Sequence, residues 1–124
     1  MKYIFFLILS TCLIVTSFAQ EPTLITDINV AKVAAEKTDT KLLLVFTADW
    51  CKICSYLESD ITKDSEILNK YTVCYIDYDS NKNLVRKYNI SAVPTSVLVD
   101  EDRGTFSSYK GRGPLLSYKK WLGL

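Results

Sequence analysis

The sequence predicts a single α/β domain built on one mixed sheet of four to five strands with helices on both faces. Strand-like apolar runs alternate with helical patterns along the chain, which is typical of α/β folds. The 124 residues match the size of one domain. Two strand-like segments near the C-terminal end are joined by a tight turn, which predicts a hairpin. Strands separated by helices are expected to pair in parallel, and the hairpin then adds an antiparallel edge.

A basic start and an apolar run over residues 3–15 are followed by Ser17 and Ala19. Small residues at these two positions form the pattern that signal peptidase cleaves, with cleavage predicted before Gln20. The run is shorter than the ~20 residues that a membrane span needs. We therefore expect residues 1–19 to be a signal peptide.

The expected mature domain, residues 20–124, is then periplasmic or secreted. Two alternatives remain open at this stage. Residues 3–19 can stay uncleaved and anchor the protein in the membrane, or Cys12 can carry a lipid. The apolar residues after Cys12 disfavour the lipoprotein. The leader sends the domain to an oxidising compartment, where disulfides form.

The first three elements follow from apolar periodicity. Residues 25–38 have the spacing of a helix, with Asp27 as a candidate N-cap. Residues 41–47 are an unbroken apolar run, which predicts a strand covered on both faces. A helix is expected from about Cys51 to Ile61.

The rest of the chain continues the alternation. A short helical piece over 66–70 is expected to begin after the candidate cap Asp64, and residues 72–78 are rich in β-branched and aromatic side chains, as strands are. The remaining expected elements are a helix over 81–88, strands over 95–99 and 105–110, and a helix over 114–122 that starts at Pro114.

Composition excludes many kinds of active site. The chain has no histidine, which rules out Ser-His-Asp and Cys-His catalysis and zinc sites of the HExxH type. Its four glycines form neither a phosphate-binding loop nor a dinucleotide fingerprint. The formal net charge is +1, which argues against a protein that binds nucleic acid. Cysteines and scattered carboxylates remain for chemistry.

The strongest chemical motif is Cys51-Lys52-Ile53-Cys54, which follows a buried strand and begins a helix. Free backbone N–H groups and the helix dipole stabilise a thiolate at Cys51, and Lys52 adds positive charge. Cys54, one turn later, is more covered and suits the resolving role. A metal site is a weak alternative because no further ligands are present, and an inert structural disulfide is another. No cofactor is expected.

Three other residues that could carry chemistry are expected to have structural roles instead. Cys74 lies in the middle of a predicted strand and is expected to fill the core. Asp77 and Asp79 come at the end of that strand and are expected to cap the next turn.

At this point the chain resembles the thioredoxin family. The resemblance rests on residues 46–54, 77–79 and 88–95 and on Gly111, in an order and spacing that cover nearly all of the mature domain. The break between residues 60 and 66 is most similar to the periplasmic branch related to the C-terminal domain of the DsbD reductase.

The resemblance implies a thioredoxin fold and a thiol–disulfide oxidoreductase. Cys51 and Cys54 are the implied catalytic pair. Trp50, Val93 and Pro94 are the implied substrate-binding residues, with a cis peptide bond at Val93–Pro94. The expected partners are protein thiols and disulfides and a possible membrane electron donor. Reduction is the expected direction and a monomer the expected state.

Several positions depart from the family pattern. Lys52-Ile53 is an unusual dipeptide between the cysteines, which leaves the direction of electron flow open. A buried Asp that often lies behind the resolving cysteine is replaced by Val45, and its usual Lys partner is replaced by Tyr75. The competing interpretation is a thioredoxin-fold binding or chaperone module whose disulfide turns over little.

Overall fold

The computed structural model describes residues 24–124, so the expected signal peptide lies outside the described part of the chain. Helices and strands alternate as the sequence predicts, and the mixed α/β fold class is confirmed. The elements are α1 (Ile28–Thr38), β1 (Lys41–Thr47), α2 (Lys52–Thr62), α3 (Ser65–Lys70), β2 (Tyr71–Asp77), α4 (Lys82–Lys87), β3 (Thr95–Asp100), β4 (Thr105–Lys110) and α5 (Leu115–Leu122).

The sheet has four strands in the order β2-β1-β3-β4. β1 pairs with β2 in parallel, but β3 runs antiparallel to β1, with Thr95 opposite Phe46. The expectation that strands separated by helices pair in parallel is therefore wrong for β3. α4 has six residues and spans about 9 Å, whereas a seven-residue strand spans about 23 Å. α4 itself covers less than half of that length, and the residues between α4 and β3 bring the chain back to the end of the sheet where β1 and β2 end, so β3 starts there.

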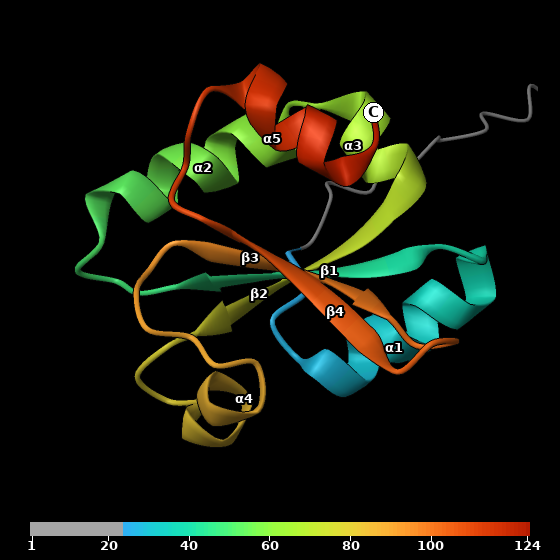
Figure 1. Cartoon of the computed structure of the whole chain (residues 1–124), viewed down its shortest axis with the longest axis horizontal. Coiled ribbons are helices and arrows are strands. Elements are labelled where there is room, and N and C mark those ends of the chain that lie inside the picture. Colours follow the sequence, from blue (N-terminus) through green and yellow to red (C-terminus); the bar gives the residue numbers. More distant parts are fainter. Residues whose placement is uncertain (1–23) are drawn as a thin grey trace, which may run out of the picture.

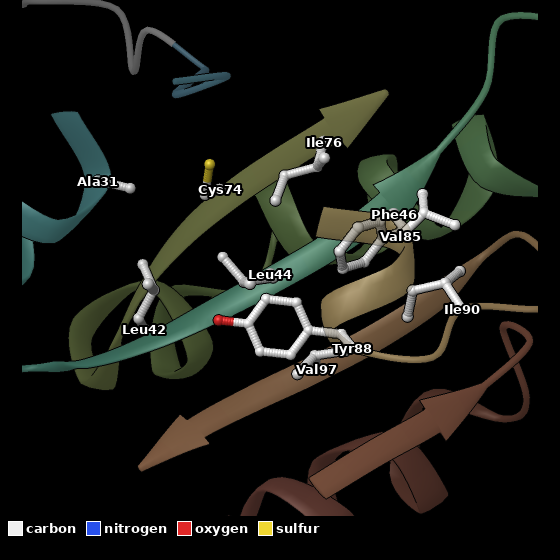
Figure 2. Close-up of a cluster of buried hydrophobic side chains, with 10 residues drawn as sticks. All are labelled: Ala31, Leu42, Leu44, Phe46, Cys74, Ile76, Val85, Tyr88, Ile90 and Val97. Carbon is white, nitrogen blue, oxygen red and sulfur yellow. The ribbon is translucent and has the colours of Figure 1, made fainter. Parts of the chain in front are cut away.

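Two layers of helices cover the sheet (Figure 1). α2, α3 and α5 lie over one face, and α1 and α4 lie over the other. β1 is buried from Leu42 to Phe46, as its unbroken apolar run predicts. Alternate side chains of β1 enter the two cores. The core on the α1 and α4 side, drawn in Figure 2, contains Ala31, Leu42, Leu44, Phe46, Cys74, Ile76, Val85, Tyr88, Ile90 and Val97.

The first helix begins later than the sequence predicts. Asp27 caps it by accepting hydrogen bonds from the N–H groups of Asn29 and Val30, so α1 starts at Ile28 rather than at Ile25. Ile25 instead forms a parallel bridge with Cys74 on the outer edge of β2. The bridge is isolated, so the sheet of the described residues has four strands, the lower number of the predicted four to five.

The predicted break between α2 and α3 is present. Asp64 accepts hydrogen bonds from the N–H groups of Glu66 and Ile67, each at 3.1 Å, and so begins α3. Lys119 of α5 lies 3.1 Å from Asp64 and 2.6 Å from Glu66, which ties α5 to the start of α3. Partial burial alone would raise the pKa of Asp64, but the Ile67 N–H, Lys119 and the Glu66 N–H together lower it.

Among residues 24–124, no helix has the length and apolar character needed to cross a membrane.

Removing the Asp64 cap should destabilise the fold in a pH-dependent way. We expect Asp64→Ala to lower the free energy of unfolding at pH 7 by about 1 kcal/mol. Asp64→Asn should cost less, because its amide oxygen still caps the helix. The pKa of this carboxyl is lower in the folded state, so its contribution is present above about pH 4 and is lost as the pH falls through the folded pKa.

Urea unfolding at pH 7, 5 and 3 measures this contribution. The gap between wild type and Asp64→Ala should be constant from pH 7 to 5 and smaller at pH 3. A gap of the same size at pH 3 would show that the ionised carboxylate is not what stabilises this helix start.

Candidate redox site

The CxxC motif lies at the start of α2. After β1 the chain turns, with the Cys51 N–H donating to the Ala48 carbonyl at 3.0 Å. Cys51 is the N-cap of α2, and its sulfur accepts a hydrogen bond from the Cys54 N–H at 3.2 Å. Cys51 and Cys54 form a disulfide, and their Cα atoms are 5.3 Å apart. The expected position of the pair, in the first turn of a helix that follows a buried strand, is therefore correct.

The two sulfurs differ in exposure. Cys51 is half-buried, whereas Cys54 is only 2% exposed. The intervening Lys52 and Ile53 are both exposed. A substrate can therefore reach Cys51 from solvent. Cys54 is shielded from solvent, so it exchanges with a substrate mainly by way of the sulfur of Cys51.

Trp50 borders the disulfide and is 69% exposed, which is unusual for a large apolar side chain. Its indole N–H donates to Asp79 at 2.9 Å. Asp77 caps the turn after β2, as expected, by accepting from the Ser80 N–H at 2.8 Å. Asp79 does not cap this turn as predicted, because its carboxylate orients Trp50 instead. No local spacing signals this role, since the two residues are 29 positions apart.

The loop before β3 lies at the same edge of the sheet as the disulfide. Because Thr95 pairs with Phe46, the residues before β3 lie beside those that follow β1 (Figure 1). The Val93–Pro94 peptide bond is cis. Pro94 is buried and Val93 half-buried. Among residues 24–124, the backbone N–H and C=O of Val93 take part in no backbone hydrogen bond.

Gly111 completes this edge. Its N–H donates to the Pro94 carbonyl at 2.8 Å, and it has a φ of +80°, a conformation that favours glycine. Trp50, the disulfide, Val93–Pro94 and Gly111, which are far apart in the sequence, are thus brought to one edge of the sheet.

Val45 and Tyr75, two positions that depart from the family pattern, lie in the apolar core under α2. Val45 is fully buried and packs in the core under α2 with Leu57 and Tyr75. Tyr75 is the register partner of Val45, and its buried hydroxyl has no hydrogen-bond partner among the described residues. Burial, with contributions from Glu58 and Tyr118, raises the pKa of Tyr75, which is therefore a neutral phenol at physiological pH. Neither residue is a proton acceptor at neutral pH.

Cys74 occupies the opposite core, beside Ala31 and Ile76 (Figure 2). It is fully buried and has a free thiol. Burial, with a smaller contribution from Asp27, raises the pKa of Cys74 to about 11. The expectation that Cys74 fills the core is correct.

The family model described as Thioredoxin matches residues 22–122. This chain belongs to the thioredoxin family. Among curated thioredoxins, it is 34% identical over 64 residues to Thioredoxin H2 of Arabidopsis thaliana, covering 51% of this chain and 48% of that protein. It is 35% identical over 65 residues to a thioredoxin of Rickettsia bellii, covering 50% of this chain and 60% of that protein. The chain thus aligns with about half the length of these curated relatives.

Solved thioredoxin structures share the fold. The germline-specific thioredoxin Deadhead of Drosophila melanogaster superposes with a TM-score of 0.66 at 24% identity, covering 82% of this chain and 98% of that one. Within residues 24–124 of this chain, no cluster of three or more cysteine or carboxylate side chains is arranged to hold a metal ion.

The three described cysteines should differ in reactivity once the disulfide is reduced. With limiting iodoacetamide at pH 7, we expect Cys51 to be alkylated first, because it is accessible and lies at a helix start. Cys54 should follow, and Cys74 should stay unmodified until the protein unfolds, because it is buried and protonated.

Peptide mass spectrometry after timed alkylation measures this order, with a sample in 6 M guanidinium chloride as the control for full reactivity. Equal labelling of Cys51 and Cys54 in the folded protein would contradict the order.

Proposed function

We propose that this thioredoxin-family chain is a thiol–disulfide oxidoreductase that exchanges electrons with protein disulfides through Cys51 and Cys54. The observation that carries the proposal is the hydrogen bond from the Cys54 N–H to the Cys51 sulfur at the start of α2. A donor aimed at this sulfur stabilises a thiolate more than a thiol, and the helix dipole acts in the same sense. The accessible cysteine is thus the one suited to nucleophilic attack.

In the reducing direction the cycle has two exchange steps. The Cys51 thiolate attacks one sulfur of the substrate disulfide, forms a mixed disulfide and expels the other substrate sulfur as a thiolate, which takes up a proton. Cys54 then loses its proton and attacks the Cys51 sulfur. The Cys51–Cys54 disulfide forms and the second substrate thiolate leaves and is protonated. The substrate gains two electrons and two protons. The protein supplies both electrons and the Cys54 proton, and the second proton comes from solvent, to which Cys51 lost it when it ionised.

Substrate binding is assigned to Trp50, Val93 and Pro94. The unpaired backbone groups of Val93 lie at the edge where the disulfide is exposed, and an extended peptide can pair with such groups. Trp50, held by Asp79, adds an exposed apolar surface next to Cys51. These features favour an extended, partly apolar segment around the substrate disulfide.

We further infer that the protein acts in the cell envelope as a reductant. The predicted signal peptide at residues 1–19 supports this location, and the break between α2 and α3 supports the similarity to the DsbD C-terminal branch. A reductant in an oxidising compartment needs a continuous supply of electrons. We assign this supply to a membrane electron donor that presents a dithiol to the oxidised Cys51–Cys54 pair.

A trapping experiment tests this function. We expect Cys54→Ala to attack substrates but not to resolve the mixed disulfide, so that mixed disulfides with envelope proteins accumulate on non-reducing gels. Cys51→Ala is the matched control and should accumulate none. Wild type should also accelerate the reduction of insulin by dithiothreitol.

Each part of the proposal has its own contradicting result. If wild type reduces insulin but neither variant captures partners, the two-step scheme is wrong. If wild type does not accelerate insulin reduction, the binding or chaperone alternative replaces the oxidoreductase. Trapped partners that are all cytosolic would rule out the envelope location.

The apolar core at Val45 predicts which step is slow. Cys54 must lose a proton before it attacks, and burial disfavours its charged form. With Val45 in this core and Tyr75 neutral, resolution depends on water or on a neighbouring thiolate. We expect resolution to limit turnover near neutral pH and to speed up as the pH rises. Val45→Asp should speed resolution at pH 7 by supplying an acceptor, while costing about 1–3 kcal/mol in stability.

Stopped-flow reduction of a model disulfide from pH 6 to 9 measures this effect. Val45→Asn is the control, because it has nearly the shape of Asp but cannot take the proton. Identical pH profiles for wild type, Val45→Asp and Val45→Asn would show that another group already accepts the proton.

A further inference from the structure

Arg112 connects the segment after β4 to α2. Its Nε donates to Asp60 Oδ2 at 2.7 Å and its Nη2 donates to Oδ1 at 3.3 Å. The guanidinium carbon lies 5.4 Å from the centroid of the Tyr56 ring. Tyr56 and Asp60 are four residues apart on α2 and therefore share one face of the helix. Arg112 thus meets α2 through a forked ion pair and a cation–π contact, a combination that lysine cannot reproduce.

The same segment is also joined to the loop that contains Pro94. The Gly111 N–H donates to the Pro94 carbonyl at 2.8 Å. Gly111 and Gly113, on either side of Arg112, both have positive φ, and a Cβ at Gly113 would overlap the Tyr109 hydroxyl. The backbone around Arg112 is therefore sharply turned, and it passes beside α2 in Figure 1.

We propose that Arg112 is a positioning residue that fixes the Val93–Pro94 loop relative to the helix that carries Cys51 and Cys54. The proposal rests on the proposed function, because it concerns how that site docks its substrate. The two halves of the site belong to different elements, and Arg112 bridges them through Gly111 on one side and Asp60 on the other.

This bridge matters for some substrates more than for others. A protein disulfide must dock its extended segment on Val93 while its sulfur meets Cys51, so it depends on the spacing between the two halves. A small aromatic disulfide needs only access to Cys51. Loss of the Arg112 contact should therefore weaken the reaction with protein disulfides selectively.

Lys119 provides a matched control within the same layer of helices. It too forms an ion pair between α5 and the α2–α3 region, through Asp64 and Glu66. These contacts are at the start of α3, after the end of α2, and they involve none of the residues at the disulfide edge. Lys119→Met should therefore lower the melting temperature without changing substrate docking.

The test compares Arg112→Met, Arg112→Lys and Lys119→Met with wild type. KM and kcat are measured for insulin reduction, and the second-order rate is measured with 5,5′-dithiobis(2-nitrobenzoic acid). We expect Arg112→Met to raise KM for insulin roughly 3- to 10-fold, with kcat and the small-disulfide rate within about twofold of wild type. Arg112→Lys should be intermediate, and Lys119→Met should leave KM for insulin and the small-disulfide rate unchanged.

Three results would overturn the proposal: no change in KM for insulin in Arg112→Met, an equal loss with both substrates, or the same rise in KM in Lys119→Met. Hydrogen exchange of the Gly111 amide separates this proposal from the proposed function. Protection of that amide should fall about tenfold in Arg112→Met and not in Lys119→Met, whether or not wild type reduces disulfides. Unchanged protection overturns the positioning role, whereas an inactive wild type with the expected loss of protection overturns only the redox function.

Discussion

The candidate site depends on the antiparallel pairing of β3 with β1. β3 starts at the end of the sheet where β1 and β2 end, and β4, antiparallel to β3, ends there too. Three loops therefore meet at one edge of the sheet. They contribute the disulfide after β1, Val93–Pro94 before β3 and Gly111 after β4. If β3 ran parallel to β1, Pro94 would lie at the opposite end of the sheet from the disulfide.

Most of the fold could be predicted from local patterns in the sequence. The apolar run of β1 predicts a central strand because no polar face interrupts it, and Asp64 predicts a helix start because its carboxylate caps nearby N–H groups. The same reasoning places Cys51 at the start of α2. It fails for β3, because apolar pattern shows that a strand exists but not which way it runs. It also fails for Ile25, because this apolar residue pairs with Cys74, which is 49 positions further along the chain.

The parts of the site that sequence reasoning missed are long-range polar contacts. Asp77 caps Ser80 three residues away, which spacing can reveal, whereas Asp79 holds Trp50 across 29 positions and Arg112 holds Asp60 across 52. A carboxylate near the end of a strand has the same local appearance in both cases. Only the folded arrangement of the loops decides whether it caps a turn or orients another side chain, so charge and spacing alone could not assign these roles.

The position of Cys51 as both the redox atom and the helix cap couples folding to electron transfer. The Cys54 N–H that contacts the sulfur in the disulfide remains available when that sulfur becomes a thiolate, and it binds the charged form more strongly. Reduction therefore changes how firmly the first turn of α2 is held. Because free energy is conserved around a cycle, the difference in unfolding free energy between the two redox forms is proportional to a difference in reduction potential. The two potentials compared are those of this pair in the folded protein and in the unfolded chain. Two denaturation curves therefore give the potential of the site relative to that of the same pair in the unfolded chain.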